Sequence, residues 1–404
     1  MVARPKLKIL HTVEFYHPSR GGAQELVKRI SELLVRRGHE VTVATTRLPE
    51  RRETVINGVR IAEFGISGNS ARGFRGDTLD YFKLLRSGGF DVMMNYAAQQ
   101  WATDLVLPIV DQIPYRKVLS PCGFSGLFWP EYGPYFRMLP ERLRLYDHLI
   151  FHSRTYRDIG LAQQHGLSHL SVIPNGAAYE EFGTPDKTFR ERYGIPKDRP
   201  LLLTVGSHTF LKGHELCMRA LRKAQIGPAT LVVIGNTLPN LSCLPQCSSL
   251  ARNVRWTTLG RKQVLLVDPP REDVVAAYHA ADLFLFGSNI ECSPIVLFEA
   301  MASRTPFIST ACGNAGEIAA WSGSGTIIPT RHTSGGLVTG KTTDMARAIE
   351  RMLADPSKRE RQAEAGYQAW RRDFTWETIA EQYERVYLNQ QKAHSSDPRQ
   401  GGAN

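Results

Sequence analysis

The sequence predicts an α/β protein of two domains, each formed by a parallel β-sheet with helices on both faces. The chain has 404 residues, and because an ordinary domain has roughly 100 to 200 residues, two or three domains are expected. Short apolar segments alternate with amphipathic ones along the chain, which is the pattern of consecutive βαβ units. A stretch rich in proline, glycine and charge, 183–200, indicates the boundary between the two domains.

The first half begins with a strand expected at Lys8–Phe15. A tight turn at Gly21-Gly22 leads into an amphipathic helix, which Gly38 ends. The further strands of this half are expected at 41–45, 91–95, 117–119 and 148–151. Because the carboxyl ends of parallel strands meet at one edge of a sheet, the ligand is expected there, in a cleft between the two halves.

The second half contains strands expected at 201–205, 231–234 and 283–286. The last two are wholly apolar, which is typical of strands buried on both faces. The final helix is expected at Thr375–Leu388, with Thr375 as its N-cap and an apolar stripe along one side. Residues 391–404 have the composition of a disordered tail.

Composition and charge exclude several classes of protein. Hydrophobic residues make up 42% and charged residues 22%, which excludes a disordered or fibrous chain. The N-terminus indicates a strand rather than a signal peptide, and no apolar run reaches the roughly 18 residues of a membrane span, so a cytoplasmic protein is expected. The net charge of +11 suits phosphorylated ligands or an anionic membrane surface. Nucleic acid is not expected as a partner, because no binding motif for it is present.

The cysteines do not indicate a metal site. Six cysteines in a chain of this kind indicate reduced thiols. Cys243 and Cys247 have a C-x3-C spacing, but no second pair of ligands follows them at a suitable distance. No structural zinc is therefore expected from this pair.

The segment 289–303, NIECSPIVLFEAMAS, indicates a phosphate site. Ser293 is expected to cap a helix, with Pro294 at the first helical position. The backbone amides of Ile295 and Val296 then have no partner within the helix. At the positive end of the helix dipole they form an anion site that suits a phosphate.

Two carboxylates, Glu291 and Glu299, flank this helix start at a spacing of eight positions. The pair resembles the E-x7-E signature of the retaining glycosyltransferases of family 4, which have the GT-B fold. Further segments are similar to that family, so the resemblance extends over roughly residues 6–390. They are Gly21-Gly22-Ala23-Gln24, Arg36–Thr45, Ile173-Pro174-Asn175-Gly176, Gly206 with Lys212-Gly213, Gly313 with Glu317, and Phe374–Tyr387.

The resemblance implies a particular architecture. Two Rossmann-like domains would face a central cleft with their parallel sheets, and a C-terminal helix would cross back to the first domain. The implied limits are 1–185 for the acceptor-binding domain, 186–373 for the nucleotide-sugar-binding domain and 374–390 for the returning helix.

The resemblance also implies an activity. The enzyme would move a sugar from a nucleotide-diphosphate sugar to a saccharide or glycolipid acceptor with retention of anomeric configuration, in bacterial surface polysaccharide or glycoconjugate biosynthesis. Glu291 would face the sugar, Glu299 the ribose hydroxyls, and Lys212 would neutralise the departing diphosphate. The donor would also contact Gly206, Ser207, Gly213, Ser293, Pro294, Ile295 and Val296, and the glycine loop with Gly21, Gly22 and Gln24 would lie near the cleft.

Three positions depart from the family pattern. Ser207 stands where the family commonly has arginine, Cys122 where it often places a histidine in the acceptor-side cleft, and Ala178 where an aspartate usually follows I-P-N-G. Two interpretations of His208 are open. It replaces that arginine, or it is simply an exposed loop histidine, and the second is expected. Ser207 and Cys122 favour one alternative, an inactive GT-B protein used as an assembly partner. A GT-B-like sugar-nucleotide epimerase is the other.

The donor site is expected to work without a metal ion. The sequence contains no D-x-D, the carboxylate pair with which many other transferases hold a metal–diphosphate complex. Lys212 and a helix dipole supply positive charge in its place. No cofactor is expected, since the nucleotide-sugar is a substrate.

The segment Tyr132–Tyr146 leaves two interpretations open. Its aromatic and apolar residues recur near helical spacing, with Arg137, Arg142 and Arg144 between them. One interpretation is a basic amphipathic surface that rests on anionic lipid at the inner face of the cytoplasmic membrane. The other is a helix packed on its own domain, with Pro140 opening a second turn.

Overall fold

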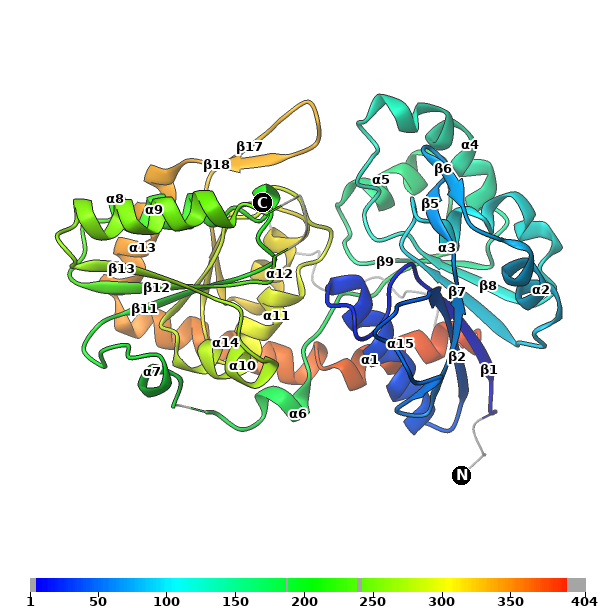
Figure 1. The fold of residues 1–404 in the computed structure, drawn as a ribbon, viewed down its shortest axis with the longest axis horizontal. Helices are drawn as coiled ribbons and strands as arrows, with labels where there is room; N and C mark the ends of the chain where they lie inside the picture. Colours follow the sequence, from blue (N-terminus) through cyan, green and yellow to red (C-terminus); the bar gives the residue numbers. More distant parts are fainter. Residues whose placement is uncertain (1–4, 187, 238–241, 391–404) are drawn as a thin grey trace, which may run out of the picture.

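The structure is a computed structural model that describes residues 5–186, 188–237 and 242–390. Two domains lie side by side, each with a parallel sheet between helices, which confirms the predicted fold class (Figure 1). The predicted disordered tail, 391–404, lies outside the described residues. No helix in the described ranges is long and apolar enough to span a membrane.

The first domain contains a mixed but mainly parallel sheet. Its strands are β1 (Lys8–Thr12), β2 (Glu40–Thr46), β3 (Val55–Ile56), β4 (Val59–Phe64), β7 (Val92–Tyr96), β8 (Arg116–Ser120), β9 (His148–Phe151) and β10 (Leu170–Val172). They are ordered β10-β9-β8-β7-β1-β2-β4-β3, and only β3 and β4 pair antiparallel. A separate hairpin consists of β5 (Ser67–Asn69) and β6 (Gly73–Arg75). The helices are α1 (Gly22–Arg36), α2 (Leu79–Ser87), α3 (Trp101–Asp104), η1 (Leu107–Gln112), η2 (Pro130–Tyr132), α4 (Gly133–Leu143), α5 (Arg157–Gln164) and α6 (Tyr179–Phe182).

The second domain contains a fully parallel six-stranded sheet. Its strands are β11 (Leu201–Val205), β12 (Ala229–Ile234), β13 (Lys262–Val267), β14 (Leu283–Phe286), β15 (Phe307–Ser309) and β16 (Gly325–Ile327), in the order β13-β12-β11-β14-β15-β16. A hairpin of β17 (Thr330–His332) and β18 (Val338–Gly340) stands apart from it. The helices are α7 (Phe189–Arg192), η3 (Phe210–Lys212), α8 (His214–Lys223), α9 (Leu244–Thr257), α10 (Arg271–Ala280), α11 (Ile295–Ala302), α12 (Ala315–Ser322), α13 (Thr342–Ala354) and α14 (Pro356–Asp373). The expected domain limits at 185 and 373 stay a prediction.

Both faces of each sheet are buried. Successive side chains of a strand point in opposite directions, so they pack into separate cores on the two faces. In β1, Ile9 packs into the core beneath α1, whereas Leu10 packs into the core on the other face. In β11, Leu203 and Leu202 are divided in the same way. Each such side chain contributes about 1.5–3 kcal/mol by leaving water, so the continuous apolar strands of the sequence become the centre of each domain.

The C-terminal helix crosses from the second domain to the first. Figure 1 shows α14 under the second domain and α15 (Trp376–Tyr387) under the first, where α15 packs against α1. The hydroxyl of Thr375 accepts a hydrogen bond from the Thr378 amide at 3.3 Å, so Thr375 is the N-cap that the sequence predicted. The apolar stripe of α15, including Ile379 and Tyr383, is buried in the first-domain core.

The crossing explains the glycine of the I-P-N-G segment. The Ala177 amide donates to the Phe374 carbonyl at 3.1 Å, and the Trp376 amide donates to the Ala177 carbonyl at 3.3 Å. A Cβ atom on Gly176 would lie 2.5 Å from the Phe374 oxygen. A side chain at this position would therefore push the two segments apart.

The aromatic segment around α4 packs on its own domain. Its apolar residues Tyr132, Tyr135, Leu139, Leu143 and Tyr146 are all buried in the first-domain core. The expectation that Pro140 opens a second turn is wrong, because α4 continues through this residue to Leu143. Any contact of this segment with lipid would have to use its exposed side, since the aromatic face already has a partner.

Candidate active site between the two domains

The predicted phosphate site is the start of α11, with one correction. The helix begins at Ile295, and Pro294 occupies the N-cap position in an extended conformation. The sequence predicted that Ser293 caps this helix. Instead, Ser293 precedes the N-cap residue, and its side chain does not cap the helix. Ile295 and Val296 remain the first two helical residues, so their amides have no carbonyl partner within the helix.

Ser293 holds the approach to α11 instead of capping it. Its hydroxyl oxygen accepts a hydrogen bond from Asn314 Nδ2 at 3.1 Å, and its carbonyl accepts one from Asn175 Nδ2 at 2.6 Å. Asn175 belongs to the I-P-N-G segment of the first domain. The helix start is thus fixed from both domains, which a local pattern of serine before proline cannot reveal.

The glycine loop of the first domain lies against this helix start. Gly22 is the first residue of α1, and a Cβ atom on it would lie 3.9 Å from Ile295 Cδ1. Gln24 turns back along the loop, where its Nε2 donates to Ser19 Oγ at 3.1 Å, and a Cβ on Gly21 would lie 2.5 Å from Gln24 Oε1. The bare backbone of the loop therefore leaves room beside α11.

Lys212 and Glu291, the two predicted catalytic residues of the second domain, form an ion pair. Lys212 Nζ donates to Glu291 Oε1 at 2.5 Å, and Ser288 Oγ donates to the same oxygen at 3.1 Å. Burial alone would lower the pKa of Lys212, but the charge and hydrogen bond of Glu291 raise it above its usual value. The stem of Lys212 passes over Gly206, where a Cβ would lie 3.5 Å from Lys212 Cγ.

The loop that carries Lys212 depends on a glycine at its end. Gly213 has a φ of 68°, and a Cβ atom on it would lie 1.9 Å from the Gly287 carbonyl oxygen. The two backbones can cross only because there is no side chain. Ser207, in the place of the family arginine, donates its hydroxyl to Asn236 Oδ1 at 2.7 Å.

Glu299 is buried on α11 and has a partner that no short sequence pattern marks. Its Oε1 accepts a hydrogen bond from Arg271 Nη2 at 2.5 Å. Arg271 also contacts Glu181 at 2.7 Å, and Glu181 pairs with Arg29 of α1. Burial would raise the pKa of Glu181, but Arg271 and Arg29 lower it overall. A line of alternating charges therefore connects the predicted ribose carboxylate with the first domain.

Cys122 lies on the first-domain side of the same site. A hydrogen bond with Cys292, the residue after Glu291, lowers the pKa of Cys122, and Tyr96 Oη donates to Cys122 Sγ at 3.4 Å. A Cβ atom on Gly123 would lie 2.8 Å from Cys292 Cβ. The loop with Cys122 is therefore in direct contact with the segment that carries the predicted catalytic carboxylate.

A cavity of about 490 Å³ opens between the domains beside this segment. Its lining includes Phe128, Tyr156 and Arg157 from the first domain and Asn289, Ile290 and Glu317 from the second. The Arg157 guanidinium lies over the rings of Phe128 and Tyr156, 5.1 and 4.9 Å from their centroids. Its Nη1 is buried and has no hydrogen-bond partner among the described residues. This arginine is a candidate ligand-binding residue that the sequence did not single out.

Glu317, which the resemblance included, joins the domains at the edge of the cavity. It lies in the first turn of α12 and accepts hydrogen bonds from Ser153 Oγ at 2.6 Å and from the Arg154 amide at 2.9 Å. The glycine loop, the Cys122 loop and the Lys212 loop each contact the segment from Glu291 to the start of α11.

His208 is not the exposed histidine that the sequence predicted. It is buried, and its side chain contacts Cys243, with Nδ1 3.8 Å from Sγ. It is therefore directed into the second domain and does not replace the missing arginine of the diphosphate loop.

Comparison with known proteins identifies the family of the chain. The family model described as Glycosyltransferase Family 4 matches residues 20–181, and the model described as Glycosyl transferases group 1 matches residues 185–369. The D-inositol 3-phosphate glycosyltransferase of Xylanimonas cellulosilytica is 27% identical over 409 residues, 92% of each chain. That of Kineococcus radiotolerans is 26% identical over 98% of this chain and 99% of its own.

Solved structures share the fold over nearly the whole length. Sucrose-phosphate synthase from Thermosynechococcus elongatus matches with a TM-score of 0.77 and 20% identity, over 95% of this chain and 99% of that chain. Anabaena Alr3699/HepE in complex with UDP matches with a TM-score of 0.72 and 17% identity, over 95% and 100%. With both halves of the chain matched by glycosyltransferase models and the GT-B fold in place, the protein is a glycosyltransferase enzyme that belongs to family 4.

Proposed function

We propose that this enzyme transfers a sugar from a nucleotide-diphosphate sugar to a saccharide or glycolipid acceptor with retention of anomeric configuration. The observation that carries the proposal is the Lys212–Glu291 ion pair, placed just ahead of the helix start whose first amides are free. The HepE structure that contains UDP supports a nucleoside diphosphate as the ligand of this fold.

The donor diphosphate would bind where the positive groups converge. The amides of Ile295 and Val296 donate hydrogen bonds to one phosphate, and Lys212 contacts the other. As the bond from sugar to phosphate breaks, negative charge grows on the diphosphate, and these fixed donors stabilise it. Preorganised stabilisation of this kind commonly contributes several kcal/mol to the barrier reduction. The raised pKa of Lys212 keeps it protonated for this task at neutral pH.

The two glutamates would have different tasks. Glu291, hydrogen-bonded to Lys212 and Ser288, faces the sugar and orients the lysine. Glu299, fixed by Arg271, accepts hydrogen bonds from the ribose hydroxyls. No metal ion is required at the diphosphate, because Lys212 and the helix dipole supply the positive charge.

The acceptor would enter from the interdomain cavity. Its volume of about 490 Å³ falls within the range of small-ligand sites, about 300–1,000 Å³. The buried, unpaired Nη1 of Arg157 suits an acceptor with an anionic group, since an unsatisfied guanidinium nitrogen gains most from a charged partner. The two full-length relatives are named as glycosyltransferases of an inositol phosphate, which agrees with this chemistry.

A panel of nucleoside diphosphates and their sugars tests the proposal. A ligand at 100 times its dissociation constant stabilises the fold by about 2.7 kcal/mol, enough for a clear thermal shift. Chromatography measures the release of the nucleoside diphosphate, which should be lost when Lys212 is replaced with alanine. It should persist in Lys197→Ala, the matched control, because Lys197 is an exposed lysine that also pairs with a glutamate, Glu191. An isomerised nucleotide-sugar would identify the epimerase alternative, and binding without turnover would identify an inactive assembly partner.

We also propose that the enzyme works at the inner face of a bacterial cytoplasmic membrane, in surface polysaccharide or glycoconjugate biosynthesis. Since the aromatic face of α4 is buried, contact with lipid depends on the exposed side with Arg137, Met138 and Leu145. Changing Arg137, Arg142 and Arg144 to glutamate should reduce co-sedimentation with anionic liposomes, and raised salt should do the same. Unaltered co-sedimentation would contradict this location.

A further inference from the structure

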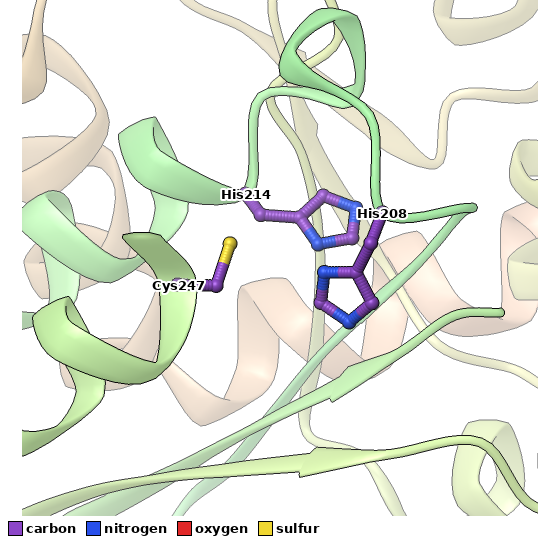
Figure 2. Close-up of side chains that lie close together, drawn as sticks. All are labelled: His208, His214 and Cys247. Carbon is purple, nitrogen blue, oxygen red and sulfur yellow. The ribbon is translucent and has the colours of Figure 1, made fainter. Parts of the chain in front are cut away.

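Behind the loop that carries Lys212, two histidines and a cysteine converge in the interior of the second domain. Figure 2 shows the rings of His208, from the loop after β11, and His214, from the start of α8, next to each other, with the sulfur of Cys247 of α9 nearby. One ligand atom from each of the three lies within 4.8 Å of the other two. The side chains are buried, with exposed fractions of 1%, 2% and 3%.

A fourth donor of the same kind lies beside them. Cys243 Sγ is 3.8 Å from His208 Nδ1 and 3.6 Å from Cys247 Sγ. Zinc bonds of about 2.0–2.3 Å in a tetrahedron place neighbouring ligand atoms roughly 3.3–3.8 Å apart. The two distances from Cys243 Sγ agree with that spacing. The ligand atoms of His208, His214 and Cys247, which lie within 4.8 Å of one another, reach it if they move about 1 Å closer together.

One histidine of this cluster has no other partner for its ring nitrogens. Neither ring nitrogen of His214 has a hydrogen-bond partner among the described residues, although buried polar groups almost always have one. A neutral imidazole binds a metal ion through such a ring nitrogen. As part of an apolar core, this histidine would leave two unsatisfied nitrogens.

We propose that His208, His214, Cys243 and Cys247 bind a structural zinc ion. Two imidazoles and two sulfurs in a closed, buried arrangement are the donor set of structural zinc sites. Binding would release the thiol proton of each cysteine, and the two thiolates would balance the charge of the ion.

The ion would fix the geometry of the donor site. His208 and His214 stand at the two ends of the segment that contains Lys212 and Gly213. Cys243 is the N-cap residue of α9, and Cys247 lies in its first turn. One ion would therefore hold both ends of the loop and attach it to a neighbouring helix. This consequence rests on the proposed role of Lys212, whereas the metal site itself does not.

Metal content tests the site directly. The full chain, purified from cells grown with added zinc and dialysed against a weak chelator, should contain about one zinc per chain by mass spectrometry. The double variant Cys243→Ala/Cys247→Ala should contain less than about a tenth of that amount. Cys217→Ala is the matched control, because Cys217 is equally buried in the second domain but lies outside the cluster, and it should keep its zinc.

A spectrum of the unaltered protein covers the case in which the double variant does not fold. After the zinc is exchanged for cobalt(II), the wild-type chain should show the strong visible bands of a tetrahedral ion and a thiolate charge-transfer band. Wild-type protein without zinc and without these bands would overturn the proposal, as would equal zinc in the double variant or a disulfide between Cys243 and Cys247.

Donor kinetics separate the metal site from the proposed function. Loss of zinc should raise the KM for the nucleotide-sugar about tenfold, and restoring the ion should reverse the change. A protein that contains zinc in this cluster but transfers no sugar would contradict the proposed function and leave the metal site standing.

Discussion

Replacing Glu299 with alanine should weaken the binding of a bare nucleoside diphosphate by about ten- to a hundredfold. The carboxylate is buried on α11, one turn after the amides proposed to bind the phosphate, and in this proposal it accepts hydrogen bonds from the ribose. Hydrogen bonds to a charged partner contribute about 1.5–3 kcal/mol, and each 1.4 kcal/mol is a factor of about ten in affinity. Isothermal titration calorimetry with the diphosphate measures this loss.

The structure also provides a control for the ion pair that the substitution removes. Arg271 binds both Glu299 and Glu181, and its side chain is 42% exposed, so each pair contributes about 1 kcal/mol or less to stability. Glu181→Ala removes the other carboxylate that Arg271 binds, and with it the pair between Glu181 and Arg29, without touching the proposed ribose site. It should lower the unfolding temperature at least as much as Glu299→Ala does and leave the nucleotide affinity unchanged.

Glu291→Ala completes the comparison. Because we propose that Glu291 faces the sugar and not the nucleotide, turnover should fall while the bare diphosphate still binds. The assignment of roles is refuted if Glu299→Ala binds the diphosphate normally, if Glu291→Ala loses the same affinity, or if Glu181→Ala weakens binding equally.

Three further predictions follow from the same contacts. Lys212→Ala should lower kcat by about a hundred- to a thousandfold, as expected for the loss of one fixed donor to developing charge, and Lys212→Arg should recover part of it; an unchanged kcat would remove the lysine from the mechanism. Turnover measured within minutes of adding excess EDTA should persist, whereas complete loss restored by magnesium would contradict the account of the diphosphate site. Burial raises the pKa of Asp158 to about 6, so between about pH 4 and 6 the folded state binds a proton that the unfolded state has released, and this group's contribution to stability falls as the pH rises. Asp158→Asn should therefore gain in unfolding temperature relative to the wild type from pH 4 to pH 7, and a constant difference would contradict the raised pKa.

Much of the fold could be predicted from the sequence, because it depends on local patterns. The apolar strands at 201–205 and 283–286 coincide with β11 and β14 in both bounds. The predicted strand at Lys8–Phe15 is too long, because β1 ends at Thr12. Val13, which follows it, is apolar and buried, and apolar residues occur in buried loops as well as in strands. The N-cap at Thr375 was predictable because capping is a contact between residues three apart.

The rest depends on contacts between distant parts of the chain. The local sequence around Ser293 is typical of a helix cap. In the structure, however, Asn175 donates to its carbonyl and Asn314 to its hydroxyl, and both residues belong to distant parts of the chain. Arg271 reaches Glu299 from a neighbouring helix and carries no motif. The amphipathic pattern of α4 shows that one face is covered, but only the packing shows that the first-domain core covers it.

The candidate zinc ligands illustrate the same limit. No second pair of ligands follows Cys243 and Cys247 in the sequence, because the two histidines precede them and reach the cluster through the β11–α8 loop. In the sequence, His208 is a loop residue beside Ser207, and nothing near it indicates a metal site. The fold brings the histidine pair and the cysteine pair together, and a rule based on spacing along the sequence cannot predict this.

The stereochemistry of transfer tests the central claim most directly. With the nucleotide-sugar that gives the largest thermal shift and a matching acceptor, proton NMR of the early product reports the configuration at the anomeric carbon through its coupling constant. The account predicts the same configuration in product and donor, with release of one nucleoside diphosphate for each sugar transferred. An inverted product, or an isomerised nucleotide-sugar without transfer, would contradict it.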